Sequence, residues 1–207
     1  MKFWRRKLLR PKDRFDPTVA RQTPVQQGVR VYERKDREAC LAIYKANEPG
    51  RFPEGIFEEF AEELEKPGRL WLVIEDQEEL TAFGGISLDQ SQYSAAHLMF
   101  GMVHPDRHGQ GFGTTLLFAR LAALPCPDRW TTIYLNPVEA SKNFYQRFGF
   151  ADFGRVQSPN SSSDTEILYS VLTRRAWDSM RGLLGRQLEG ICIEKEIEVD
   201  IEWPSAW

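Results

Sequence analysis

Residues 103–117 have the sequence Val103-His-Pro-Asp-Arg-His-Gly-Gln-Gly-Phe-Gly-Thr-Thr-Leu-Leu117. An apolar run precedes this stretch and a helical pattern follows it, which predicts a buried strand, a glycine-rich turn and a helix. Gly109, Gly111 and Gly113 can adopt positive φ and let a ligand come close to the backbone. The first N–H groups of a helix have no partner within it and point outward together. The stretch therefore predicts an anion site suited to a phosphate or pyrophosphate.

Three kinds of phosphate-binding loop can be compared with this stretch. A P-loop needs a lysine and then Ser or Thr after its last glycine, whereas Gly113 is followed directly by Thr114. A dinucleotide-binding turn needs its third glycine where Thr114 stands. The segment His108-Gly-Gln-Gly-Phe-Gly113 resembles the acyl-coenzyme A loop of the GNAT superfamily of N-acetyltransferases, whose pattern is Gln/Arg-x-x-Gly-x-Gly/Ala. His108 in the first position departs from that pattern, and a glycine-rich turn without a ligand is the alternative.

A second segment strengthens the resemblance. Residues 135–150 have the sequence Leu135-Asn-Pro-Val-Glu-Ala-Ser-Lys-Asn-Phe-Tyr-Gln-Arg-Phe-Gly-Phe150. This is similar to the second GNAT motif, in which a strand ends in Asn, a helix carries an aromatic Tyr, and Gly-Phe follows. The two motifs stand in the family's order and spacing, and the resemblance covers roughly residues 28–173.

The hydrophobic periodicity predicts alternating α and β elements, and hence an α/β fold with a mixed sheet covered by helices. The resemblance implies the GNAT form of this fold, with a mostly antiparallel sheet, helices on both faces and two central strands that splay apart. Strands are expected at 29–33, 70–75, 81–88, 95–104, 131–135, 150–153 and 166–172, and helices at 36–46, 56–66, 113–124 and 140–148.

The resemblance also implies an activity and a cofactor. Acetyl-CoA would donate its acetyl group to a primary amine, which attacks the thioester directly through a tetrahedral intermediate. The pantetheine arm would enter between the strands at 95–104 and 131–135, and a backbone N–H there would stabilise the oxyanion. The residues implied to bind the cofactor are Met102, Val103, His108, Gly109, Gln110, Gly111, Phe112, Gly113, Thr114, Asn136 and Asn143.

Two side chains are candidates for moving protons. Tyr145 matches the family's general acid, and a phenol with a pKa of about 10 can protonate a leaving thiolate. His97 falls where the histone-modifying branch has its glutamate base, and an imidazole with a pKa near ~6.5 suits base work at neutral pH. The alternatives are an aromatic ring that only packs the helix, for Tyr145, and a strand histidine bonded to a neighbour, for His97.

The two ends differ from the middle in composition, so we expect three parts. Residues 1–27 form a basic, flexible arm that could also contact an anionic membrane surface or RNA. Residues 28–173 form the GNAT-like domain. Residues 174–207 form an extension with an amphipathic helix and then an acidic strand that alternates polar and apolar residues, which could join two subunits in a homodimer.

Composition limits the functional classes. The 207 residues carry a net charge of −3, which argues against nucleic acid as the main partner, and three scattered cysteines form neither a disulfide framework nor a zinc pattern. With no membrane-length apolar run and no signal-like start, we expect a cytoplasmic protein without a metal site. The acceptor is a small-molecule or peptide amine that the sequence does not identify. A silent CoA-binding module, acting as a sensor or scaffold through the arm or the acidic strand, is the alternative function.

Overall fold

The computed structural model describes residues 28–48, 52, 56–89, 95–123, 132–157 and 166–173. The expected basic arm at 1–27 and the expected extension at 174–207 lie outside these residues. Cys126 and Cys192 also lie outside them. The described residues contain most of the predicted GNAT-like domain and all of the strands in its sheet order, so its architecture can be followed from β1 to β7.

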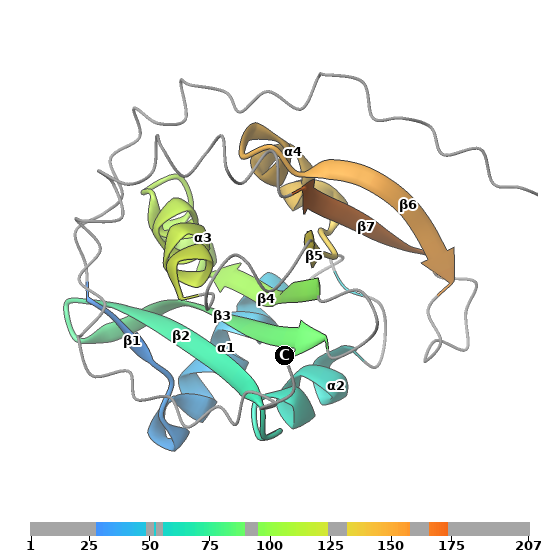
Figure 1. Ribbon diagram of the computed structural model, residues 1–207. Coiled ribbons are helices and arrows are strands. Elements are labelled where there is room, and N and C mark those ends of the chain that lie inside the picture. The colour runs from blue at the N-terminus through green and yellow to red at the C-terminus, as the bar shows by residue number, and fades with distance from the viewer. Residues whose placement is uncertain are drawn as a thin grey trace, which may run out of the picture.

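One seven-stranded sheet organises the domain, with the strand order β1-β2-β3-β4-β5-β7-β6 (Figure 1). Neighbouring strands are antiparallel except β4 and β5, which are parallel. This confirms the predicted mixed, mostly antiparallel sheet. The strands are β1 (Val29–Val31), β2 (Arg69–Asp76), β3 (Glu79–Asp89), β4 (Ala95–Val103), β5 (Thr132–Leu135), β6 (Ala151–Gln157) and β7 (Glu166–Thr173).

Helices cover both faces of the sheet, as predicted. One face packs against α3 and α4, and the other against α1 and α2 (Figure 1). The alternating side chains of β2 explain how one strand serves both faces: Leu70 and Leu72 enter the first core, whereas Trp71 enters the second. The helices are α1 (Arg37–Asn47), α2 (Ile56–Glu63), α3 (Phe112–Ala122) and α4 (Glu139–Arg147), with 3-10 turns at Arg34–Asp36 and Pro105–Arg107.

The core under α1 and α2 is rich in aromatic rings. Phe60 stacks on Tyr44 with a centroid distance of 5.1 Å and on Phe83 at 5.2 Å. It also contacts Phe100 of β4 at 5.1 Å and Trp71 of β2 at 6.0 Å. Aromatic pairs of this kind add about 0.5–1.5 kcal/mol beyond the burial of their area. The α2 helix is therefore fixed to the middle of the sheet, beside β4.

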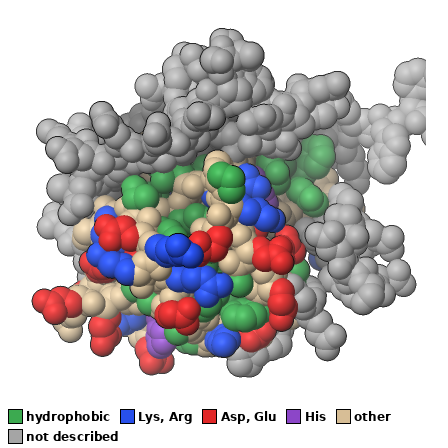
Figure 2. Space-filling view, turned by 90° about the horizontal axis from the view of Figure 1, so that it is seen from below, with side chains coloured by type: hydrophobic (Ala, Val, Ile, Leu, Met, Phe, Trp, Pro, Cys, Tyr) green, Lys and Arg blue, Asp and Glu red, His purple; other side chains and the backbone are tan. Residues whose placement is uncertain are grey.

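Surface charges are mixed in sign, and no metal-binding cluster is present in the part of the chain described. Figure 2 shows acidic and basic side chains interspersed over one side of the molecule, and ion pairs such as Arg37–Glu65 are of this kind.

Within the described ranges, no group of three His, Cys, Asp or Glu side chains could hold a metal ion, and no helix is long and apolar enough to cross a membrane. Cys40 is buried in the second core, and burial raises the pKa of its thiol to about 12.

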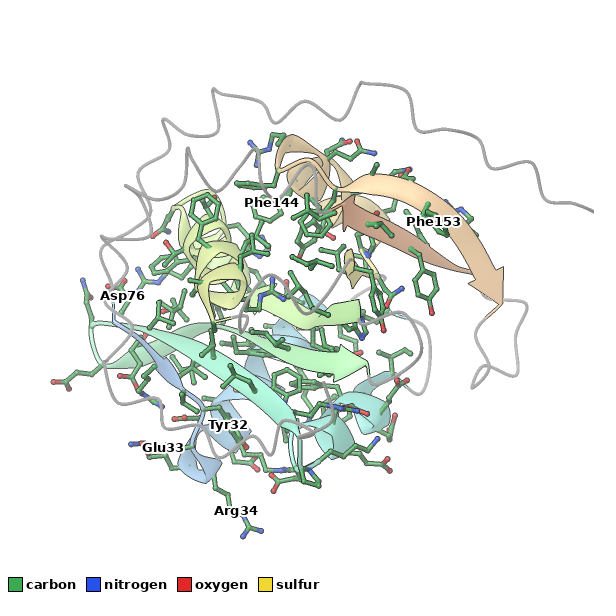
Figure 3. All side chains as sticks on the ribbon, in the orientation of Figure 1. Tyr32, Glu33, Arg34, Asp76, Phe144 and Phe153 are labelled. Carbon is green, nitrogen blue, oxygen red and sulfur yellow. The ribbon has the colours of Figure 1, made fainter. Side chains whose placement is uncertain are left out.

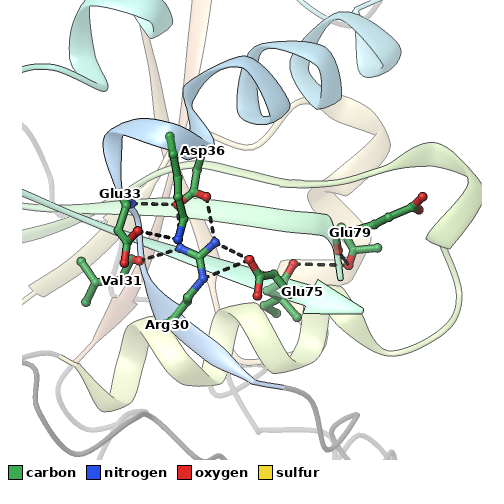
Figure 4. A network of polar contacts seen from close by, with 9 residues as sticks. Arg30, Val31, Glu33, Asp36, Glu75 and Glu79 are labelled. Carbon is green, nitrogen blue, oxygen red and sulfur yellow. Dashed lines mark hydrogen bonds and ion pairs between the residues drawn. The ribbon is translucent and has the colours of Figure 1, made fainter. Parts of the chain in front are cut away.

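An ion-pair network fixes the first strand to the first helix (Figure 4). Arg30 of β1 donates to both carboxylate oxygens of Asp36, at 2.6 and 2.8 Å, and also pairs with Glu75 of β2. Asp36 accepts a further bond from the backbone N–H of Glu33 at 2.7 Å. An Asp directly before a helix favours a side-chain cap, but the carboxylate of Asp36 makes no capping bond to α1 because Arg30 and Glu33 engage it.

Replacing Asp36 with Asn should lower the free energy of unfolding by about 2 kcal/mol at pH 7, because charge-assisted bonds from Arg30 are lost. Burial alone would raise the pKa of Asp36, but the bonds from Arg30 and Glu33 outweigh burial and hold that pKa below its ordinary value. The contribution is therefore present above about pH 4 and is lost as the pH falls through the folded-state pKa. Urea unfolding should show the wild type and Asp36→Asn converging between pH 7 and pH 3.

The exposed Glu38 provides a matched control on the same helix. Glu38→Gln should change the unfolding free energy by less than ~0.5 kcal/mol at pH 7. If the difference in unfolding free energy between wild type and Asp36→Asn is the same at pH 7 and pH 3, the charge of Asp36 is not the source of its stabilising effect.

Candidate active site

The central strands β4 and β5 separate part of the way along their length. Their parallel pairing runs from Ala95 and Thr132 to His97 and Tyr134 and then stops, although β4 continues to Val103. A bulge follows the last pair, because the register of β3 against β4 changes between Phe83 and Gly85, leaving Gly84 opposite both Phe100 and Gly101. Phe100 has a φ of +42°, which is rare for a side chain of its size. The predicted splay of these two strands is present.

The glycine-rich loop after β4 has the conformation that its sequence predicts. Gly109 and Gly111 have φ values of +76° and +92°, and Gly111 is the N-cap of α3. The N–H groups of Thr114 and Thr115 both donate to the Gly111 carbonyl at 3.0 Å. Among the described residues, the N–H groups of residues 109–113 have no acceptor. They form a row of free donors at the positive end of a helix, where an anion is stabilised.

A cavity of about 1520 Å³ lies between the glycine-rich loop, the splayed strands β4 and β5, and α4. Its size is well above that of an ordinary small-molecule site, so it could hold a long, extended ligand. It gathers predicted site residues that lie far apart in the sequence. Those lining it are His97, Met102, Val103, His108, Gly109, Gln110, Gly111, Gly113, Thr114, Asn136 and Tyr145.

Two predicted site residues are placed differently. The side chain of Phe112 is only 2% exposed and lies in the core under α3, so only its backbone belongs to the loop. Asn143 is exposed and lines a separate shallow hollow with Phe144, Gln146 and Arg147. The helical position of Asn143 turns it away from the cavity that Tyr145 lines, because residues two apart on a helix do not face the same way.

His108, the residue that departs from the family pattern, fixes the loop to the end of β4. Its Nε2 lies 3.0 Å from the Val103 carbonyl oxygen. The same oxygen accepts a bond from Asn47 Nδ2 at 3.0 Å, and Asn47 also donates to Ile43 at 2.9 Å. A carbonyl oxygen has two lone pairs. Both are engaged at Val103, so a ligand would have to displace one partner to bind this oxygen.

His97 lies at the point where β4 and β5 separate. Its ring stacks on Tyr134 with a centroid distance of 4.4 Å and an interplanar angle of 7°. Burial lowers the pKa of His97 to about 4, although a hydrogen bond with Asn136 opposes the shift. Asn136 in turn donates to the Leu168 carbonyl at 3.2 Å, which fixes its amide. The imidazole is therefore neutral at pH 7, and it contacts both the ring of Tyr134 and the side chain of Asn136.

Tyr145 reaches the cavity from α4, and its neighbours fix its ring. The ring contacts Phe144 at 5.0 Å and Phe150 at 5.7 Å between centroids. Figure 3 shows Phe144 on the inner side of α4, and a Cβ at Gly113 of α3 would lie 3.6 Å from its ring. The Tyr145 hydroxyl has no hydrogen-bond partner among the described residues, so it can serve a bound molecule.

Sequence reasoning missed Asn47, Tyr134 and Arg120, which also line the cavity. Arg120 had a signal, since it is the one charged residue in the apolar run of α3. Asn47 had a weaker one, as a polar residue four positions after Ile43 on the buried face of α1. Tyr134 alternates with core residues along β5, and nothing in its sequence neighbourhood distinguishes it from a surface tyrosine.

Comparisons with solved structures show the same fold at low sequence identity. An aminoglycoside 6'-N-acetyltransferase complexed with coenzyme A matches with a TM-score of 0.53 and 20% identity, over 70% of this chain and 96% of that one. A spermidine N-acetyltransferase chimera from Vibrio cholerae and hSSAT gives 0.56 and 18%, over 73% and 98%. An Escherichia coli N-acetyltransferase that acts on the alanine of a ribosomal protein gives 0.54 and 20%, over 70% and 90%.

No curated protein matches the chain. A family model does: the one described as the acetyltransferase (GNAT) family matches residues 37–150, from the start of α1 to the Gly-Phe after α4. This range includes the bulged strand, the glycine-rich loop and Tyr145. The chain therefore belongs to the GNAT family of N-acetyltransferases, whose members use acetyl-CoA.

Proposed function

We propose that this protein transfers an acyl group, most simply acetyl, from acyl-CoA to a primary amine by direct attack of the amine on the thioester. The observation that carries the proposal is a single cavity that combines three features. These are a row of free N–H donors at residues 109–113, the edge of β4 left unpaired by β5 beyond His97, and the unpartnered hydroxyl of Tyr145.

The residues present fit coenzyme A. The free N–H groups before α3 suit a pyrophosphate, which needs many donors and favours the positive end of a helix. The edge of β4 that β5 leaves unpaired would bind the amides of pantetheine in the way an added strand pairs with a sheet edge. When bound, the thioester would supply the activated acyl group. These residues would hold and orient it beside Tyr145.

The protein's part in the reaction is to move two protons. The attacking amine must lose one, and His97 is our proposed base because it lines the cavity in its neutral form. Its low pKa makes it a weak base, so its contribution depends on position more than on basicity. The leaving thiolate must gain a proton, and we assign that step to the phenol of Tyr145.

Gly109→Ala tests the loop. Nothing lies within 4 Å of a Cβ at this position, so the substitution changes only the tolerance for its φ of +76°. The strain of about 1–2 kcal/mol should distort the loop and weaken CoA binding roughly tenfold in calorimetric titration. Gly154→Ala is the matched control. A Cβ at Gly154 also has no atom within 4 Å, but the φ of Gly154 does not lie in the positive region that favours glycine. Unchanged affinity in Gly109→Ala would remove the loop from the CoA site.

Tyr145→Phe tests the proposed acid. It should lower kcat by roughly 100-fold while the Kd for acetyl-CoA stays the same, because only the hydroxyl is lost. Tyr32→Phe is the matched control, since it removes a buried hydroxyl that also lacks a partner and lies outside the cavity. The assignment of Tyr145 is rejected if kcat is retained when thiol release is followed with a saturating amine.

His97→Gln tests the proposed base. We expect kcat to fall by roughly 100-fold with CoA affinity retained. Burial lowers the pKa of His97 to about 4. The pH profile of wild-type kcat should therefore show no inflection from this group between pH 6 and 8, and kcat should fall as the pH drops through 4. An unchanged rate and pH profile in His97→Gln would exclude His97 as the base.

A further inference from the structure

Arg120 is a buried cation that no carboxylate of the described residues neutralises. It lies in the middle of the apolar α3 helix and is only 1% exposed. Its Nη1 donates to the Met99 carbonyl at a long 3.4 Å, and its Nε is buried and has no partner among the residues that the structure describes. No described Asp or Glu lies within ion-pair distance of it.

Two glycines make the space that the guanidinium occupies. A Cβ at Gly101 would lie 2.6 Å from Nη2 of Arg120, and a Cβ at Gly84 would lie 3.1 Å from its Nε. These two positions lie opposite each other across β3 and β4, within the bulge. A side chain at Gly101 would require the guanidinium to shift, and one at Gly84 would crowd it. The backbone is therefore shaped to bring this charge against the bulge, where Arg120 lines the cavity.

A guanidinium carries five N–H donors in a flat fork that matches the two oxygens of a carboxylate. Burying such a group without a counter-charge is costly, and one long bond to a carbonyl does little to offset it. The described carboxylates that line the cavity form no ion pair with Arg120. Glu63, for example, pairs with Arg69 at 2.8 Å and with Lys66 at 2.6 Å.

We propose that Arg120 is the anchor for a carboxylate carried by one of the two substrates. The carboxylate would enter the cavity either on the acyl group of the donor or on the amine acceptor, and the guanidinium would bind it through the donors that lack partners. This rests on the proposed function, because it assumes that acyl-CoA and an amine meet in this cavity. It narrows that function to substrates with a free carboxylate.

Matched substrate pairs on the purified full-length protein decide the matter. For the donor, succinyl-CoA is compared with butyryl-CoA, which has the same chain length without the carboxylate. For the acceptor, ω-amino acids of two to six carbons are compared with their amides, with acetyl-CoA as donor. In one of the two series, kcat/KM should favour the carboxylate member by on the order of 100-fold, and the series that responds identifies the source.

Arg120→Met should remove this preference by lowering kcat/KM only for the carboxylate member, while the Kd for CoA alone is kept. Arg34→Met is the matched control, because Arg34 has a 90% exposed side chain, and it should keep the preference. An equal loss for both members of each pair in Arg120→Met would overturn the proposal and leave Arg120 as a support for the bulge. If Arg120→Met does not fold, the presence or absence of a carboxylate preference in the two wild-type substrate series tests the proposal by itself.

The two possible failures give different results. Wild-type protein that binds CoA and releases thiol but shows no carboxylate preference in either series overturns the role of Arg120 alone. Wild-type protein that neither binds CoA nor releases thiol with any donor overturns the proposed function, and the role of Arg120 with it.

Discussion

Phe100 and Gly101 of β4 stand opposite the single residue Gly84 of β3, and the bulge that they form bends β4 away from β5. A bulged strand turns and twists more strongly than a regular one. Pairing with β5 therefore ends at His97, and the two strands carry their following segments apart. The glycine-rich loop follows β4 and α4 follows β5, so this one irregularity opens the cavity and sets the distance between its two walls.

The bulge needs support, because a phenylalanine at positive φ costs of order 1–3 kcal/mol. The ring of Phe100 packs against Phe60 at 5.1 Å and Trp71 at 6.3 Å between centroids. The aromatic core under α1 and α2 thus does more than stabilise the domain, since it fixes the backbone conformation from which the cavity follows.

The cavity separates its polar functions along its length. Free backbone donors gather at the loop, where His108 and Asn47 fix the end of β4 through the Val103 carbonyl. Farther along, burial keeps the imidazole of His97 neutral between Tyr134 and Asn136. Phosphate binding needs exposed donors and a positive helix end, whereas proton transfer from an amine needs an unprotonated base. The fold supplies these two environments within one opening.

The sequence by itself determined the family, the order of the elements and the part of the cavity lining that comes from the two motifs, because turn glycines, hydrophobic periods and the motifs are local signals. Gly109 and Gly111 have the positive φ that their positions predict, and Tyr145 reaches the cavity. Only the tertiary structure decided which partners Asp36, His97 and Arg120 have. The neighbours of His97 and Arg120 come from elements far away in the chain, and Arg30 of β1 reaches Asp36 only because the chain turns back between them. Gly84 and Gly101 are local signs of the bulge, but the positive φ of Phe100 is supported by aromatic rings from α2 and β2 that lie far away in the sequence.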